Sequence, residues 1–190
     1  MTATLHPSAL PPAHAVPVPP GTAIYNATAG AQFFDAYEVA DQHPARSPLQ
    51  AWLDVAQRTP AWVRGLMFVR NKAMRLVGLK DLGQLQDGHP PASGRALHDA
   101  RSYRVGDRVG IFRIRHLSDT EVVMGQDDRH LDVQVSISKH HAPDSPPTVV
   151  LSTVVHIHNA LGHAYMAVVT PFHRVIARGT AQRMAAHGQR

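Results

Sequence analysis

Acidic and imidazole side chains gather in the last third of this chain of 190 residues. His130 and Asp132 stand at the start of one segment of alternating polar and apolar residues, and His156 and His158 stand at the end of the next. Alternate side chains of a β-strand share a face, so each of these two pairs projects to one side. A carboxylate beside an imidazole suits proton transfer, because it orients the ring and moves the ring pKa toward the working pH. We therefore identify His130, Asp132 and His156 as candidate catalytic residues.

The same side chains allow two other interpretations. His156 and His158, completed by His130 or Asp132, have the ligand types of a zinc site with an open position. A chain with 14 histidines also produces such a spacing by chance, and we expect no metal. Alternatively, Asp132 and His130 satisfy each other or backbone donors at a strand end, since buried polar groups are normally paired for stability alone.

The elements that position these residues are two strands and a helix. Alternation of apolar and polar residues predicts strands over 131–137 and 149–157. Asn159 is a suitable N-cap for a helix that extends to about Ala186, and Pro171 should kink or divide this helix. The residues expected to face a ligand from the last strand and the helix are His158, Thr153, Tyr165, Phe172 and His173. Aromatic residues at helical spacing are also common in ordinary cores.

The first half of the chain supplies the remaining elements. Residues 1–22 hold six of the 15 prolines, and we expect a disordered tail before a single domain over 23–190. A short strand is predicted over 33–39. Ser47-Pro48 and Thr59-Pro60 are helix-start signals, and apolar residues at helical spacing follow each of them. Two helices followed by an antiparallel meander and one long helix predict an α+β fold.

Composition excludes several classes of function. The formal charge of +5 comes from arginines spread along the chain without a basic run, so we expect no nucleic-acid partner. No apolar run reaches the roughly 20 residues that cross a bilayer, and we expect no membrane partner. The chain has no cysteine, which excludes disulfides and fits a cytoplasmic location. It also has no G-x-G-x-x-G segment, so we expect no dinucleotide cofactor.

Several motifs carry a resemblance to a bacterial family, domain of unknown function 2867 (DUF2867). They are Gly65-Leu66, Arg70-Asn71, Glu121 to Gly125, His130-Leu131-Asp132, Thr153 to Asn159, Gly162, Tyr165 and Pro171 to Arg174. The order of elements also resembles the helix-grip (START/Bet v 1-like) architecture. That resemblance implies a curved antiparallel sheet around a long C-terminal helix, with two short helices after the first strand. It also implies an apolar cavity between sheet and helix, since helix-grip proteins commonly bind apolar small molecules.

These observations lead to one main functional hypothesis and two alternatives. The main hypothesis is a domain that binds a small apolar or amphipathic molecule between its sheet and its C-terminal helix, with a homodimer as a further possibility. The first alternative is an enzyme that performs acid–base chemistry of the cyclase, hydratase or hydrolase type in the same pocket. The second is a regulatory module that binds a protein partner.

Overall fold

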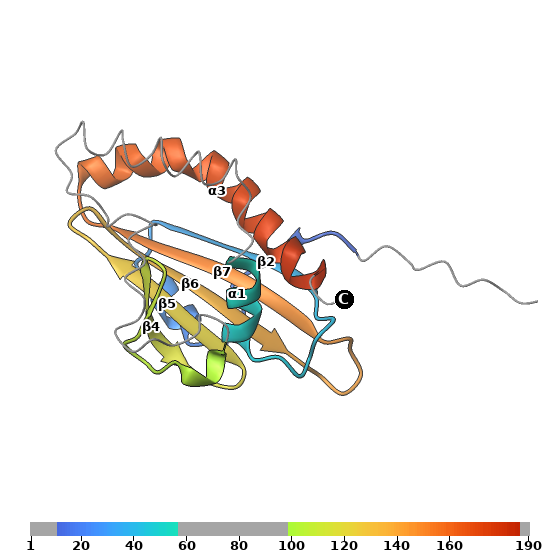
Figure 1. Ribbon diagram of the computed structural model, residues 1–190. Helices are drawn as coiled ribbons and strands as arrows, with labels where there is room; N and C mark the ends of the chain where they lie inside the picture. Colours follow the sequence, from blue (N-terminus) through green and yellow to red (C-terminus); the bar gives the residue numbers. More distant parts are fainter. Residues whose placement is uncertain (1–10, 57–98, 187–190) are drawn as a thin grey trace, which may run out of the picture.

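The computed structural model describes residues 11–56 and 99–186. Within these residues a curved antiparallel sheet packs against a long C-terminal helix, α3 (Ala160–Ala186), and a short helix, α1 (Pro48–Ala56), packs on the same side of the sheet (Figure 1). The fold is therefore α+β, as the order of elements predicts. The second helix expected after the first strand lies outside the described residues.

The sheet has seven strands in the order β1-β2-β7-β6-β5-β4-β3, and all its pairings are antiparallel. Strands β3 to β7 form a meander, and β7 pairs on its other side with β2, so the early strand of the chain lies beside the last one. The strands are β1 (His14–Ala15), β2 (Phe33–Ala40), β3 (Arg108–Val109), β4 (Phe112–Leu117), β5 (Glu121–Asp127), β6 (Leu131–His140) and β7 (Thr148–Ile157).

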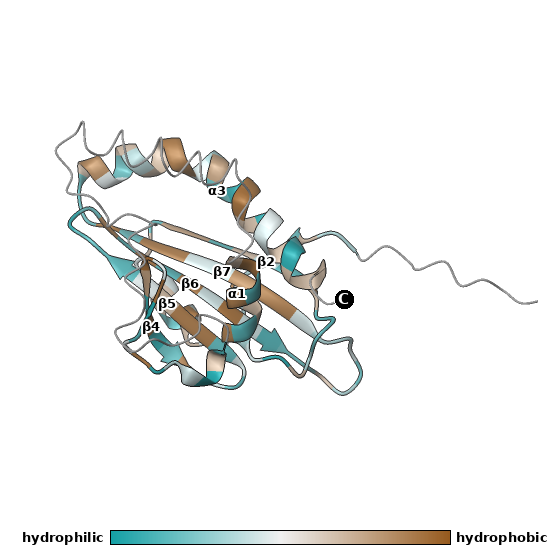
Figure 2. Cartoon of the chain, viewed as in Figure 1, coloured by the Kyte–Doolittle hydropathy of each residue, from teal (hydrophilic) through white to brown (hydrophobic). Residues whose placement is uncertain are grey.

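One face of the sheet packs against the two helices and holds the main core. Tyr37 of β2 and Leu151 of β7 are directly opposite each other in the sheet and pack in one cluster with Ala177 and Ala181 of α3. Nearer the start of α3, Leu131 and Val155 pack against Met166 in a second cluster. Hydrophobic residues on β5, β6 and β7 mark this core in Figure 2. We call this side of the sheet the helix face.

The opposite face, here called the outer face, is covered by residues 16–31. Val18 and Ile24 pack against Ala36 and Val154 of the sheet. A 3-10 turn, η1 (Ile24–Thr28), follows in this segment. At its start, the buried carboxylate of Glu121 accepts hydrogen bonds from the backbone N–H groups of residues 23 and 24. The structure therefore differs from the expectation of a disordered tail over 1–22, because the described part from residue 11 pairs through β1 and buries apolar side chains. Alternating apolar residues between the prolines provide that burial.

The helix ends follow local sequence signals. Ser47 Oγ accepts the backbone N–H of Gln50 at the start of α1, and Asn159 Oδ1 accepts that of Gly162 at the start of α3, so both predicted N-caps are confirmed. Pro171 lies inside α3 without dividing it, and the helix curves along its length (Figure 1). Among the described residues, no helix combines the length and the hydropathy needed to cross a membrane.

Candidate functional site

Asp132 lies on the outer face of the sheet, away from α3. Its two carboxylate oxygens accept hydrogen bonds from Arg115, at 2.7 Å from Nη1 and 2.5 Å from Nη2. This hydrogen bonding raises the pKa of Arg115 above its ordinary value. The guanidinium reaches Asp132 by crossing Gly125 of β5, where a Cβ atom would lie 2.4 Å from Arg115 Cζ. Gly125 is therefore required by the path of the Arg115 side chain.

His156 is the neighbour of Asp132 across β6 and β7, and it shares the outer face. Its Nε2 atom lies 2.8 Å from the carbonyl oxygen of Ala27, which can only accept, so Nε2 carries the proton. The contact holds η1 against the sheet. The expected position of Asp132 and His156 beside a space between sheet and helix is therefore wrong, because Leu131 and Val155 occupy the helix-facing positions there.

His130 and His158 lie where the hairpin between β5 and β6 meets the start of α3. His130 Nδ1 is 3.4 Å from Asn159 Oδ1, and His158 Nδ1 is 3.0 Å from the carbonyl oxygen of Asp128. The His158 N–H also donates to the His130 carbonyl. These contacts connect the hairpin between β5 and β6 to the start of α3. The catalytic roles of His130, Asp132 and His156 stay predictions, but the structure does not bring the three into one pocket.

The residues expected to contact a ligand from α3 point in different directions. Tyr165 is half-buried against the cluster of Leu131, Val155 and Met166. Phe172 is 49% exposed on the outer side of the helix. His173 faces the sheet, with its ring 5.4 Å from that of Phe33 in an edge-on contact at 89°. Of the three, His173 contacts an acidic residue of the sheet.

His173 contacts the carboxylate of Asp35, a residue of β2. The distance from His173 Nε2 to Asp35 Oδ1 is 3.0 Å, and the side chains are 22% and 15% exposed. The second carboxylate oxygen, Oδ2 of Asp35, is buried and has no hydrogen-bond partner among the described residues. Asp35 therefore has one oxygen bound to α3, while the Tyr37 hydroxyl also interacts with its carboxylate, and Oδ2 has no hydrogen bond of good geometry within the described part of the chain.

Two further polar residues share the helix face with Asp35. Thr153 of β7 is directly opposite Asp35 in the sheet and is 4% exposed. Tyr37 is the next helix-facing residue of β2. Its pKa is raised first by burial, then by the negative charge of Asp35 and by a side-chain hydrogen bond with Asp35. Directly opposite and alternate positions place these side chains next to one another. Asp35, Tyr37, Thr153 and His173 form a polar group between the sheet and α3, which we call the Asp35 site.

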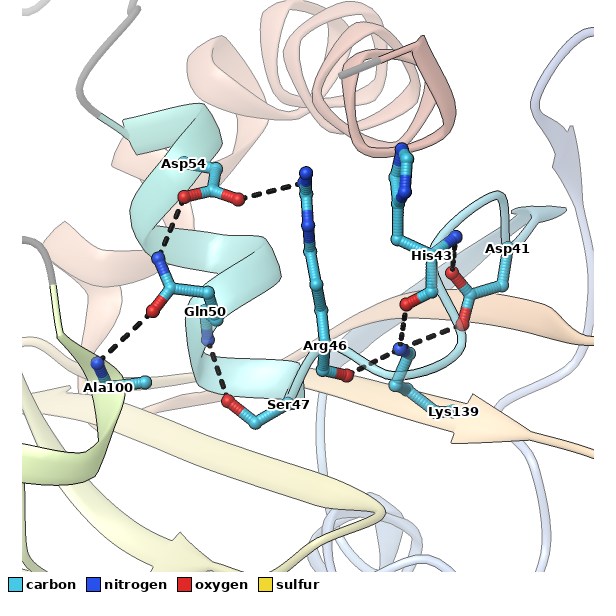
Figure 3. A network of polar contacts seen from close by, with 8 residues as sticks. All are labelled: Asp41, His43, Arg46, Ser47, Gln50, Asp54, Ala100 and Lys139. Carbon is cyan, nitrogen blue, oxygen red and sulfur yellow. Dashed lines mark hydrogen bonds and ion pairs between the residues drawn. The ribbon is translucent and has the colours of Figure 1, made fainter. Parts of the chain in front are cut away.

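A second polar network lies at the other end of the sheet, beside α1 (Figure 3). Lys139 Nζ lies 2.9 Å from Asp41 Oδ2 and donates to the carbonyl oxygens of His43, Pro44 and Arg46 at 2.8, 3.1 and 2.5 Å. An ammonium group has three hydrogens, so these four oxygens use all its donors. Lys139 and Asp41 are only 10% and 7% exposed. The buried cation thus holds the loop between β2 and α1 in its folded path.

The same network continues through α1 to the segment before β3. Arg46 Nη1 donates to Asp54 Oδ2 at 2.9 Å, and Gln50 Nε2 donates to Asp54 Oδ1 at 2.8 Å. Gln50 Oε1 accepts the backbone N–H of Ala100, at the start of the 3-10 turn η2 (Ala100–Ser102). Figure 3 shows this chain of contacts from Lys139 to Ala100. Its members bind one another and connect four segments of the chain.

The cavity beside this network is too small for an organic ligand. Its volume is about 10 Å³ between the network, Val149 and Met184, which is room for about one water molecule. Sites for organic ligands measure about 300 Å³ or more. The described residues also contain no group of three or more His, Asp or Glu side chains arranged to hold a metal ion. The network therefore has a structural role. The Asp35 site is the functional candidate because of its buried polar groups, and no cavity volume supports it.

Asp35, the central residue of the candidate site, was missed by the sequence analysis. The signal was present, because Phe33, Asp35, Tyr37 and Val39 alternate on one side of a predicted strand and the only acid among them falls on its apolar side. The histidines in the last third of the chain are a more conspicuous pattern than this single acid, and the prediction was based on them. Residues on adjacent strands that are more than 100 positions apart in the chain, such as Asp35 and Thr153, cannot be paired from spacing alone.

Comparison with known proteins places the chain in one described family. Residues 27–180 match the model of a family described as "Protein of unknown function (DUF2867)". The comparisons with curated proteins and with solved structures gave no match.

Proposed function

This chain belongs to the DUF2867 family, and we propose that it binds a small, partly apolar molecule at the Asp35 site, between its sheet and α3. The ligand donates a hydrogen bond to Asp35 Oδ2 and places its apolar part against neighbouring core residues. The observation that carries the proposal is the buried Asp35 carboxylate, whose Oδ2 atom has no hydrogen bond of good geometry among the described residues.

The energetic argument concerns that oxygen. A buried acceptor without a donor costs about 1–3 kcal/mol, and more when it is charged. His173 compensates Asp35 through Oδ1 only. Thr153 is directly opposite Asp35 in the sheet, and the Tyr37 hydroxyl also interacts with the Asp35 carboxylate through a side-chain hydrogen bond. A ligand that donates to Oδ2 removes the penalty, and this gain selects for molecules that carry a hydroxyl or an N–H group.

The surroundings of the site fit a ligand of mixed character. Phe33, Val155 and Met166 form an apolar wall on one side, and Tyr37 and Leu151 belong to the apolar cluster on the other. Binding sites for small molecules combine mainly hydrophobic lining with a few polar groups that fix orientation. We also propose that the fold belongs to the helix-grip class, because a long C-terminal helix packs across a curved antiparallel sheet.

A fragment screen tests the proposal. Ligand-observed NMR compares the binding of neutral ring compounds that carry one hydroxyl or N–H donor with their O- or N-methylated analogues. We expect donor-bearing fragments to bind the wild-type protein and their methylated analogues to bind at least about tenfold more weakly, as expected for one lost hydrogen bond to a charged group. Asp35→Ala should remove this preference.

The matched control is Glu38→Gln, which changes an acid of the same strand on the outer face, where Glu38 contacts Thr148. This variant should keep the preference for donors. Equal binding of both fragment series by the wild-type protein, or an unchanged preference in Asp35→Ala, would show that Asp35 does not recognise a ligand.

A further inference from the structure

Two arginines of α3 lie beside the Asp35 site. Arg174 follows His173 directly in the helix, and Arg178 is one turn further along, so the two arginines project to a similar side of α3. Burial and Asp35 raise the pKa of Tyr37, and the positive charges of Arg174 and Arg178 oppose this rise. The site therefore combines a buried carboxylate with two cations that are close enough to act on its tyrosine.

Arg178 has a structural partner at this edge of the sheet. Its Nε atom donates to the carbonyl oxygen of Ala13 at 2.8 Å. Ala13 directly precedes β1, in which Ala15 is the strand partner of Tyr37. This hydrogen bond therefore connects α3 to the strand beside Tyr37, which explains why Arg178 is placed here without any ligand.

The guanidinium of Arg174 differs in this respect. Arg174 is exposed, and within the described residues its side chain forms no hydrogen bond or ion pair. α3 contains no acidic residue, and Glu38, the other acid of β2, contacts His14 and Thr148 instead. A guanidinium binds a carboxylate through two parallel hydrogen bonds, so it can hold an anionic group in a fixed orientation. Arg174 is thus a suitable anchor for a negative charge at the edge of the Asp35 site.

We propose that the ligand of the Asp35 site is an amphipathic carboxylate whose negative group binds Arg174. Its hydroxyl or N–H group donates to Asp35 Oδ2, and its apolar part lies between these two ends. The carboxylate must be at the end remote from Asp35, because two neighbouring carboxylates disfavour each other's charge. This inference rests on the proposed binding at Asp35 and adds the charge class of the ligand.

Three ring compounds separate the two interactions. 4-Hydroxyphenylacetate carries a hydroxyl donor and a carboxylate, its methyl ester keeps the donor without the charge, and methyl 4-methoxyphenylacetate has neither. Ligand-observed NMR with the full-length protein measures their dissociation constants at neutral pH. We expect the wild-type protein to bind 4-hydroxyphenylacetate about fivefold more tightly than its ester. High salt should reduce this difference, because it screens charges at the surface.

Substitutions of single arginines assign the effect. Arg174→Gln should make the acid and its methyl ester bind equally, while the preference for the hydroxyl donor stays. Arg174→Lys should keep part of the preference for the acid, since an ammonium group supplies the charge without the planar fork. The matched control is Arg108→Gln, which removes an exposed arginine from β3, at the opposite edge of the sheet. This variant should bind as the wild-type protein does, and thermal melting checks that all variants are folded.

The outcomes separate this inference from the proposed function. Equal binding of the acid and its methyl ester by the wild-type protein, with the donor preference intact, overturns the anionic ligand alone. A preference for the acid that survives Arg174→Gln, or that Arg108→Gln reduces equally, also overturns it, because the net charge of the protein would then be the cause. If the two esters bind equally well, recognition by Asp35 fails, and the inference fails with it.

Discussion

Asp35 occupies a helix-facing position on β2, where the neighbouring positions carry Phe33, Tyr37 and Val39. A carboxylate at such a position loses water on folding, and the contact with His173 compensates one of its oxygens. For a purely structural contact with His173, Asp35 Oδ1 alone is enough, and a second buried acceptor such as Oδ2 adds nothing. Oδ2 has no hydrogen bond of good geometry among the described residues, and we interpret it as the atom that accepts a hydrogen bond from a ligand.

Because Tyr37 is close to Asp35, the ionisation of its hydroxyl makes the stability of the protein depend on pH. Burial and the Asp35 carboxylate raise its pKa in the folded protein. Above about pH 10, the ordinary pKa of tyrosine, the unfolded chain therefore loses this proton before the folded protein does. The unfolded state then binds fewer protons, so the free energy of unfolding falls as pH rises.

Urea unfolding at a series of pH values from neutral to alkaline measures this effect. Tyr37→Phe should show a shallower loss of stability above about pH 10 than the wild-type protein. Tyr25→Phe is the matched control, because Tyr25 is 44% exposed, and it should follow the wild-type curve. Identical curves for Tyr37→Phe and wild type would contradict the raised pKa.

Gly125 leaves room for one neighbouring side chain, that of Arg115. A Cβ atom at this position meets only the end of Arg115, so Gly125→Ala should displace the guanidinium from Asp132 and destabilise the protein by about 1 kcal/mol or less. In an Arg115→Ala background the same change should be neutral or stabilising, because alanine reduces the entropy of the unfolded chain. A double-mutant cycle by urea unfolding measures the difference, and additive effects would exclude this explanation of the glycine.

At the scale of elements, α3 depends on how its first turn meets the sheet. Gly162 is buried there, and a Cβ atom would lie 2.4 Å from the backbone oxygen of His130 and 2.7 Å from Ile157 Cγ2. Backbone atoms cannot rotate away as the Arg115 side chain can. The start of α3 and the hairpin between β5 and β6 are therefore locked together by Gly162, Asn159 and the two histidines.

Two glycine substitutions in α3 test this attachment. Gly162→Ala should destabilise the protein and increase amide exchange in the first turns of α3, because the helix start must move away from His130. Gly179→Ala is the matched control, since the nearest atom to its Cβ position is Arg183 Nη1 at 3.8 Å, and it should stabilise the helix by up to about 1 kcal/mol. Equal effects of the two substitutions would contradict a close approach that is specific to Gly162.

At the scale of the whole molecule, local signals predicted the elements well. Period-two alternation located β2, β6 and β7, and the caps Ser47 and Asn159 located both described helices. The arrangement of side chains on the two faces was harder to predict. Both sides of β7 are apolar, with Val149 and Leu151 on one and Val150 and Val154 on the other. Alternation alone therefore could not show which side faces α3, and the histidines were placed on the wrong one.

The segment over residues 16–31 is the physical reason for that error. It covers the outer face with Val18 and Ile24, so that face is a second core layer and needs apolar residues as well. Its proline content suggested disorder, but proline also favours the extended path that a covering segment follows. His156 and Glu121 then serve this layer by binding the backbone of residues 23–27.

Native mass spectrometry of the protein purified from its own host tests the central claim most directly. We predict that the wild-type protein retains an added mass of a small organic molecule, that Asp35→Ala loses it, and that Glu38→Gln keeps it. Wild-type protein without any added mass, or the same added mass in Asp35→Ala, would contradict a ligand held by Asp35 between the sheet and α3.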